Sequence, residues 1–235
     1  MSAAQRAVEV QFGRGAGSRL ERIVSFTKRI ALGEFLQGDD PGNGKRYMTA
    51  YMDGLDPARP FHEASEHPWC STLATGIGAI TSELQEHLSS QLWERTDGED
   101  AHRLYAPEWR SIVLVKHGIW VRGLQFPRTQ AVIRSLQGVR LVEVNLARMR
   151  PRTRIAPHSD NTNFVLCAHL GLELEDGCSV LHVGNKARSW RKGKILVFDH
   201  SYIHSATNDS DRDRYVLFCR FYHPALRDEE CYAVS

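Results

Sequence analysis

The second half of the chain reads as a series of short apolar segments that follow one another with no helical segment between them. These segments span residues 139–148, 152–157, 164–174, 179–183, 187–190, 195–198 and 215–222. Glycine, asparagine and aspartate, which favour turns, separate them. Consecutive strands must bury their apolar faces against other strands, so the pattern predicts a sandwich or barrel of the jelly-roll type.

Helical patterns are confined to the first half of the chain. Apolar residues recur every three or four positions between Ser71 and Trp93, which predicts a helix that covers one face of a sheet. A strand is predicted at 110–115, and a short helix follows with Pro127 in its first turn. The predicted fold is therefore mainly β, with N-terminal helices that buttress a jelly roll.

The N-terminal residues have a different character. A helix is predicted between Ser18 and Leu36, and the glycine-rich run at 38–44 predicts a flexible loop. We therefore divide the chain into an N-terminal extension, residues 1–45, and a β domain, residues 46–235. A chain of 235 residues is long enough to bury one sizeable core.

Charge and cysteine content limit the expected partners and compartment. The formal net charge is only +2, and no apolar run is long enough to span a membrane, so we expect neither nucleic acid nor membrane as a partner. The five cysteines are scattered and odd in number, which favours free thiols in a reducing compartment. With no apolar signal segment at the start, we expect a cytoplasmic protein; the N-terminal arginines leave organelle import as the alternative.

One short motif, Pro157-His158-Ser159-Asp160, combines an imidazole and a carboxylate. Residues two apart in an extended strand point to the same face, so His158 and Asp160 can be directed at one point. His204, from a later strand, would complete two histidines and one carboxylate, a set typical of non-haem Fe(II) oxygenases. We therefore predict that His158, Asp160 and His204 bind iron and are catalytic, with His200 as the alternative distal ligand.

Arg214 is predicted to lie near this metal site. The run 208–211 predicts a turn between two strands, and a hairpin there would place Arg214 beside His204. Burial of an arginine without an anion is costly. A dicarboxylate such as 2-oxoglutarate would supply that anion through a bidentate salt bridge. His169, in an apolar strand, is either a core residue or a residue that faces the ligand.

These residues occur in an order that resembles the aspartyl/asparaginyl β-hydroxylase family of 2-oxoglutarate- and Fe(II)-dependent dioxygenases. The shared pattern consists of 157–163, His169-Leu170-Gly171-Leu172, Gly177-Cys178, Trp190, Gly193-Lys194, Phe198-Asp199, His204, Arg214 and His223-Pro224. Upstream, Tyr51-Met52-Asp53-Gly54-Leu55, Trp109 and Phe126-Pro127 occur in matching order. The resemblance thus covers roughly residues 48–227.

The resemblance implies a double-stranded β-helix, the cupin-like form of the jelly roll. It implies that His158 and His204 bind Fe(II), that Arg214 and His169 contact 2-oxoglutarate, and that Trp109 lies at the edge of the site. The implied reaction hydroxylates a C–H bond of an amino acid, of a residue in a peptide or protein, or of a related small molecule. O2 is then a co-substrate, and ascorbate is expected to support activity.

The chain departs from the family's animal aspartyl hydroxylase at several positions. Asp160 stands in place of a glycine and completes the carboxylate-containing ligand set, as in members that resemble proline hydroxylases; it also argues against halogenase chemistry. Cys167 replaces an arginine and Ala147 a serine, which leaves the substrate open. Four arginines form either a basic rim of the site or a solvated edge: Arg148, Arg150, Arg152 and Arg154.

Two other functions remain as alternatives. A non-catalytic jelly-roll module would use the same pocket to bind a metal or a ligand. A zinc hydrolase fits less well, because such sites need a nearby general base and Arg214 would have no role in them.

Overall fold

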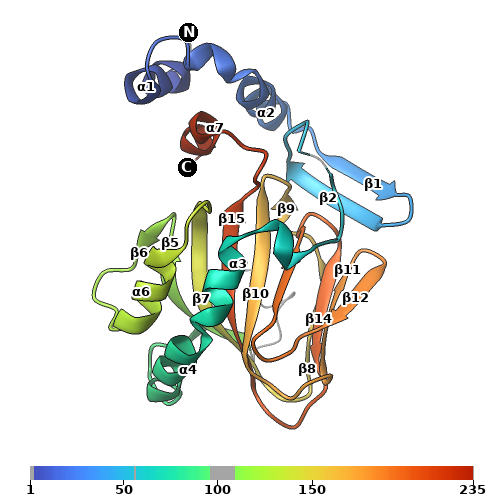
Figure 1. Cartoon of the computed structure of the whole chain (residues 1–235). Coiled ribbons are helices and arrows are strands. Elements are labelled where there is room, and N and C mark those ends of the chain that lie inside the picture. The colour runs from blue at the N-terminus through green and yellow to red at the C-terminus, as the bar shows by residue number, and fades with distance from the viewer. Residues whose placement is uncertain (1–2, 56, 96–108, 235) are drawn as a thin grey trace.

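Two β-sheets face each other in the computed structural model, which describes residues 3–55, 57–95 and 109–234 (Figure 1). The larger sheet runs in the order β3 (Phe61–His62), β13 (Ile195–Phe198), β10 (Val165–Glu173), β15 (Arg214–Tyr222), β7 (Leu141–Met149), β5 (Trp109–Lys116) and β4 (Glu94–Arg95), with β6 (Ile119–Trp120) paired to β5. The smaller sheet runs β12 (Lys186–Ser189), β11 (Ser179–Val183), β14 (His204–Asn208) and β8 (Thr153–His158). The chain is mainly β, and the predicted jelly roll is confirmed.

Strand β10 shows how the alternation of side chains builds two cores. Leu166 and Leu170 point away from the smaller sheet and pack in a cluster with Leu73 and Leu84 of the covering helices. Cys167 points inward and packs with residues of the smaller sheet such as Leu181. Both faces of β10 are covered, which explains why the strand is apolar almost throughout. In the sheet it lies between β13 and β15.

Three helices cover the outer face of the larger sheet: α3 (Trp69–Thr75), α4 (Ile77–Glu86) and α6 (Pro127–Ser135) (Figure 1). The single helix predicted between Ser71 and Trp93 is thus broken and ends early. The break falls at Gly76, where a Cβ atom would lie 2.5 Å from a methyl carbon of Val132 in α6. The close approach of α6 therefore explains the glycine at the break. A short 3₁₀ helix, η2 (Ala64–Glu66), precedes α3.

The N-terminal helices lie with the C-terminal one at one end of the molecule (Figure 1). These are α1 (Ala3–Phe12), the 3₁₀ helix η1 (Gly17–Arg19), α2 (Glu21–Ala31) and α7 (Asp228–Val234). Val8, Ile23 and Leu226 belong to their shared apolar cluster. A salt bridge of 2.6 Å between Arg22 and the buried carboxylate of Glu230 also connects α2 to α7.

The flexible loop predicted at 38–44 is wrong. β1 (Leu36–Asp40) and β2 (Gly44–Ala50) form an antiparallel hairpin, and β2 also pairs in parallel with β9 (Asn161–Thr162). Gly42 and Gly44 have φ angles of +80° and +107°, which a glycine adopts without strain, so the glycines close a tight turn rather than loosen the chain. The division of the chain at residue 45 stays a prediction.

The connection between β14 and β15 also differs from the predicted hairpin. β14 pairs with β11 and β8, whereas β15 pairs with β10 and β7, so the connection crosses from one sheet to the other. Asn208 holds this crossing: its Nδ2 group lies 3.1 Å from the carbonyl oxygen of Met149 and 2.9 Å from that of Arg212. Arg214 is therefore on the sheet that faces His204, not beside it.

All five cysteines are free thiols, as predicted. The cytoplasmic location inferred from them stays a prediction. Among the described helices, none combines the length and the apolar character needed to cross a membrane.

Candidate active site

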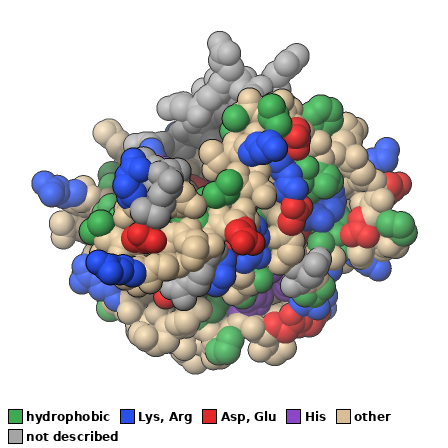
Figure 2. Space-filling model, turned by 90° about the horizontal axis from the view of Figure 1, so that it is seen from above, with side chains coloured by type: hydrophobic (Ala, Val, Ile, Leu, Met, Phe, Trp, Pro, Cys, Tyr) green, Lys and Arg blue, Asp and Glu red, His purple; other side chains and the backbone are tan. Residues whose placement is uncertain are grey.

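A cavity of about 690 Å³ lies between the two sheets. Every residue that the sequence singles out for a metal or co-substrate lines it: Trp109, His158, Asp160, His169, His204 and Arg214. In the view from above (Figure 2), histidine side chains are visible at one place, below the side chains around it. The fold thus brings together residues that are far apart in the chain.

The two histidines of the candidate metal site are directly opposite each other on neighbouring strands. His158 ends β8 and His204 begins β14, and their ring centroids are 4.2 Å apart. Nδ1 of His158 lies 2.8 Å from the carbonyl oxygen of Ala156, and Nδ1 of His204 lies 2.9 Å from that of Tyr202. A carbonyl can only accept, so each Nδ1 carries the proton and each Nε2 remains a lone-pair donor to a metal.

Burial keeps His204 in the state that a metal needs. The desolvation of its ring lowers the pKa of His204 to about 4, and the charge of Asp160 opposes this only in part. The imidazole is therefore neutral at physiological pH, which is the form that ligates metal ions.

Asp160 brings the carboxylate to the two rings. Its Oδ1 atom lies 3.6 Å from Nε2 of His158, and the ligand atoms of His158, Asp160 and His204 all lie within 4.8 Å of one another. The other oxygen, Oδ2, accepts hydrogen bonds from Nδ1 of His200 at 3.0 Å and from Nη2 of Arg220 at 2.5 Å. One carboxylate oxygen is thus held by the protein while the other faces the histidines.

The same two partners keep Asp160 ionised. Burial alone would raise the pKa of Asp160, but the hydrogen bond from His200 and the charge of Arg220 outweigh it, so that pKa lies well below its usual range. The sequence left His200 as an alternative to His204 for the second histidine that binds the metal. Because its Nδ1 group donates to Asp160 and its Nε2 lies 3.4 Å from the hydroxyl of Thr162, the geometry favours His204 instead.

A second group of potential ligands is less suited to a metal. Asp160, Cys167 and His200 also lie within 4.8 Å of one another. Burial, however, raises the pKa of the Cys167 thiol far above its usual range, and it is the thiolate that binds metals.

Arg214 is a buried cation on the opposite wall of the cavity. Its residue is 1% exposed, and none of its three guanidinium nitrogens has a hydrogen-bond partner among the residues that the structure describes. The guanidinium carbon lies 4.2 Å from the ring centroid of Trp190 and 5.5 Å from that of Trp109. Desolvation lowers the pKa of Arg214 to about 9, so it stays charged at neutral pH.

His169 faces the cavity rather than the outer core. Its ring stacks on Trp190, with centroids 5.8 Å apart and planes 11° apart, and it also contacts Phe198 and Phe218. Neither ring nitrogen has a hydrogen-bond partner within the described part of the chain. Burial and the charge of Arg214 lower the pKa of His169 well below its usual range, so the ring is a neutral donor and acceptor.

Two residues that the sequence did not identify as functional also contribute to the site. Trp190 covers both Arg214 and His169, and Arg220 binds Asp160. Arg220 follows Arg214 at an even spacing in the same strand, which in a β-strand means the same face. That spacing was a usable signal for Arg220, whereas Trp190 stood in the shared family pattern without an assigned role.

The arginines between 148 and 154 do not form an unpaired basic rim. Three of them pair with aspartates of the β14–β15 connection: Arg148 with Asp213 at 2.6 Å, Arg152 with Asp211 at 2.9 Å and Arg154 with Asp209 at 3.9 Å. The partly exposed ion pairs fit the alternative interpretation, a solvated edge.

Comparison with known proteins agrees with the sequence resemblance. A family model described as Aspartyl/Asparaginyl beta-hydroxylase matches residues 76–224, more than half of the 235-residue chain. The mouse protein named Aspartyl/asparaginyl beta-hydroxylase is 26% identical over 189 residues, which cover 69% of this chain and 24% of the mouse protein.

Two further relatives carry different names. Ornithine lipid ester-linked acyl 2-hydroxylase of Rhizobium tropici is 28% identical over 176 residues, which cover 70% of this chain and 61% of that protein. Human Aspartate beta-hydroxylase domain-containing protein 2 is 30% identical over 141 residues, 54% of this chain and 37% of that protein. The chain thus spans less than two thirds of each of these relatives. The stretch matched by the family model contains all six predicted site residues. The chain belongs to the aspartyl/asparaginyl β-hydroxylase family.

Proposed function

We propose that this protein is a 2-oxoglutarate- and Fe(II)-dependent dioxygenase that hydroxylates a C–H bond. One observation carries the proposal: a buried arginine without an acidic partner among the described residues faces a group of two histidines and one carboxylate across a single cavity. Two relatives are named as hydroxylases, which supports hydroxylation as the type of reaction.

The surroundings of Arg214 fit one end of a dicarboxylate. A buried guanidinium is stable only when an anion compensates its charge, and a carboxylate matches its donors in a bidentate pair. The indole faces of Trp190 and Trp109 hold the guanidinium in place. His169, with both ring nitrogens buried and without partners among the described residues, offers one more donor to the same anion.

The donors of the opposite wall fit Fe(II). Neutral imidazoles and an ionised carboxylate are the ligands of mononuclear iron oxygenases, and three protein ligands leave positions for a co-substrate and O2. His158, Asp160 and His204 would hold the ion, through Nε2 of each histidine and Oδ1 of the aspartate.

When bound, Fe(II) with 2-oxoglutarate and O2 supplies the oxidation: 2-oxoglutarate is converted to succinate and CO2 while a substrate C–H bond gains a hydroxyl group. The protein residues orient these groups. The carbonyls of Ala156 and Tyr202 fix the two imidazoles, and Arg220 and His200 fix the carboxylate. Arg214 anchors the end of the co-substrate that does not react.

We place the substrate against a polar part of the cavity wall. Asn145 donates to Oε1 of Glu143 at 2.6 Å, and the Oδ1 atom of Asn145 is buried with no partner in the described part of the chain. Arg220 lies 3.5 Å from the other oxygen of Glu143. These groups favour a polar substrate that presents N–H donors: an amino acid, a residue in a peptide or a related small molecule.

A spectroscopic titration tests the proposal. Fe(II) added anaerobically to the protein, followed by 2-oxoglutarate, should produce a weak visible charge-transfer band, and exposure to air should then release succinate. His204→Ala should lose both signals. Vigorous succinate formation by His204→Ala would refute the site. A band without any succinate, across a broad panel of amino acids and peptides, would support the non-catalytic binding module instead.

A further inference from the structure

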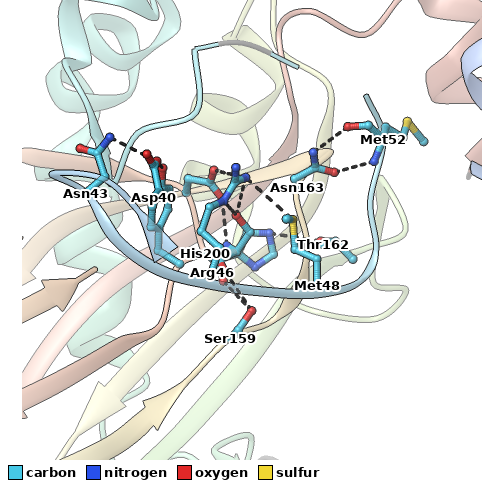
Figure 3. A network of polar contacts seen from close by, with 12 residues as sticks. Asp40, Asn43, Arg46, Met48, Met52, Ser159, Thr162, Asn163 and His200 are labelled. Carbon is cyan, nitrogen blue, oxygen red and sulfur yellow. Dashed lines mark hydrogen bonds and ion pairs between the residues drawn. The ribbon is translucent and has the colours of Figure 1, made fainter. Parts of the chain in front are cut away.

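Strand β2 contacts both segments that carry the candidate metal ligands. It belongs to the β1–β2 hairpin, which lies outside the residues matched by the family model. In Figure 1 the hairpin projects beside the smaller sheet, and Figure 3 shows the polar contacts that connect it to the site.

On one side β2 pairs with the residues just before His204. The amide of Ile203 donates to the carbonyl of Lys45 at 2.9 Å, and the amide of Tyr47 donates to that of Ser201 at 3.1 Å. Arg46 forms an isolated antiparallel bridge with Tyr202. The backbone that leads into His204 is therefore fixed by β2.

On the other side β2, and Met52 just beyond it, bind the residues between and after His158 and Asp160. The hydroxyl of Ser159, which stands between these two ligands, lies 2.5 Å from the carbonyl oxygen of Tyr47. Asn163 and Met52 exchange two hydrogen bonds, of 2.9 Å and 2.8 Å, between the Asn163 side chain and the Met52 backbone (Figure 3).

Arg46 fixes the turn at residues 199–201. Its Nε and Nη2 groups lie 3.0 Å and 2.8 Å from the Ser201 hydroxyl, and Nη2 lies 3.2 Å from Oδ2 of Asp199. Oδ1 of Asp199, which is buried, accepts from the amide of Ser201 at 2.8 Å. The same turn carries His200, the residue that binds Asp160.

We propose that strand β2 is a positioning element of the metal centre: it sets the separation of the two ligand-bearing segments, with Arg46 and Ser159 as its positioning residues. The proposal rests on the proposed function, because it takes His158, Asp160 and His204 as the ligands. Neither residue is placed to touch the metal; each holds backbone that leads to a ligand. Loss of a group that orients metal ligands typically weakens metal binding about 10–100-fold.

The test compares Arg46→Met with a matched control, Arg188→Met. Both arginines pair with a carboxylate, at 3.2 Å and 2.6 Å, and both lie over an aromatic ring, at 4.9 Å and 4.8 Å from its centroid. Arg188 binds Glu63, away from the ligand segments. Binding of Mn(II) to the full chain is measured by calorimetry at a temperature where circular dichroism shows each variant to be folded. Arg46→Met should bind Mn(II) at least about tenfold more weakly, and Arg188→Met should bind as the wild type does.

Ser159→Ala and Ser159→Thr provide a second, milder pair. Threonine keeps the hydroxyl that contacts Tyr47, so it should restore the Mn(II) affinity that alanine loses. Equal Mn(II) affinity in the wild type and Ser159→Ala, or in the wild type and a folded Arg46→Met, would overturn the positioning role. If Arg46→Met does not fold, the serine pair decides. Failure of the wild type itself to bind Mn(II) would instead refute the metal site and with it the proposed function.

Discussion

Replacement of Arg214 by methionine should make the ligand-free protein more stable and at the same time strongly reduce its stabilisation by 2-oxoglutarate. Burial lowers the pKa of Arg214 to about 9. A pKa depressed by several units, at about 1.36 kcal/mol per unit, corresponds to a desolvation cost on the order of 4–5 kcal/mol. In the ligand-free protein no described residue offsets this cost with a hydrogen bond.

Methionine matches the length of the arginine stem and fits between the two indole rings without a charge. Exchange of buried charges for apolar side chains is often neutral or stabilising by about 1–4 kcal/mol. For a chain of this size about 1 kcal/mol shifts the melting temperature by roughly 2–4 °C. We therefore expect the melting temperature of ligand-free Arg214→Met to rise by a few degrees, up to about 10 °C.

Stabilisation of the protein by 2-oxoglutarate, in contrast, should decrease in the variant. With Mn(II) in place of Fe(II) to prevent turnover, 2-oxoglutarate at about 100 times its dissociation constant should stabilise the wild type by about 2.7 kcal/mol. Removal of one partner of a buried charge pair costs about 2–5 kcal/mol of binding. The variant should therefore bind 2-oxoglutarate at least about 30-fold more weakly and keep at most about a third of the wild-type stabilisation at the same concentration.

Arg148→Met is the matched control for thermal unfolding. Arg148 is paired with Asp213 at 2.6 Å, so methionine leaves this carboxylate with the Tyr215 hydroxyl but without its cation and should not stabilise the protein. The 2-oxoglutarate shift of this control should equal that of the wild type. A less stable Arg214→Met that retains the full 2-oxoglutarate shift would refute the assignment of Arg214 as the anion-binding residue.

Three further outcomes are expected. His204→Ala should bind Mn(II) more than about tenfold more weakly in calorimetry, and unchanged affinity would exclude His204 as a ligand. Burial lowers the pKa of His62 to about 4, so the folded protein keeps it neutral while the unfolded chain protonates it below about 6.5; urea unfolding should therefore show stability falling as the pH drops from about 6.5 to 4, by up to roughly 3 kcal/mol. His62→Gln should reduce this fall by that amount, with the rest due to His169 and His204, and an identical pH profile would contradict the contribution of His62. Glu83 accepts the backbone amides of Arg128 and Thr129 at 3.1 Å and 2.8 Å in the first turn of α6; Glu83→Ala should cost about 2 kcal/mol in the same urea assay, and a change within error would show that water replaces the cap.

The β strands of the second half were predictable because alternation and turn residues are local signals. β11 and β13 begin and end at the predicted residues. The convergence of His158, Asp160 and His204 was also predicted, but not for the reason that the two-residue spacing suggested: β8 ends at His158, so Asp160 lies just beyond the strand and is not on its face. A local turn signal, in contrast, does not say which sheet the next strand joins. The connection that Asn208 holds therefore looked like a hairpin in the sequence and is a crossing between sheets.

The hairpin β1–β2 could not be predicted for a related reason. Its strands contain few apolar residues, and its glycines read as a loop. Besides its neighbour β1, the partners of β2 are the segment before His204 and β9, which lie more than a hundred residues further along the chain. The contacts of Trp190 with Arg214 and His169, and that of Arg220 with Asp160, escaped prediction in the same way, because they depend on segments that meet only in the folded molecule.

Incorporation of oxygen-18 shows whether the protein is a dioxygenase that uses 2-oxoglutarate. The protein, Fe(II), ascorbate and 2-oxoglutarate are incubated under oxygen-18 gas with a panel of amino acids, peptides and a cell extract, and the products are analysed by mass spectrometry. We expect one labelled oxygen atom in succinate and one in a hydroxylated product, both absent in His204→Ala. Labelled succinate at equal levels in wild type and His204→Ala, or its absence from the wild type across the whole panel, would contradict this expectation.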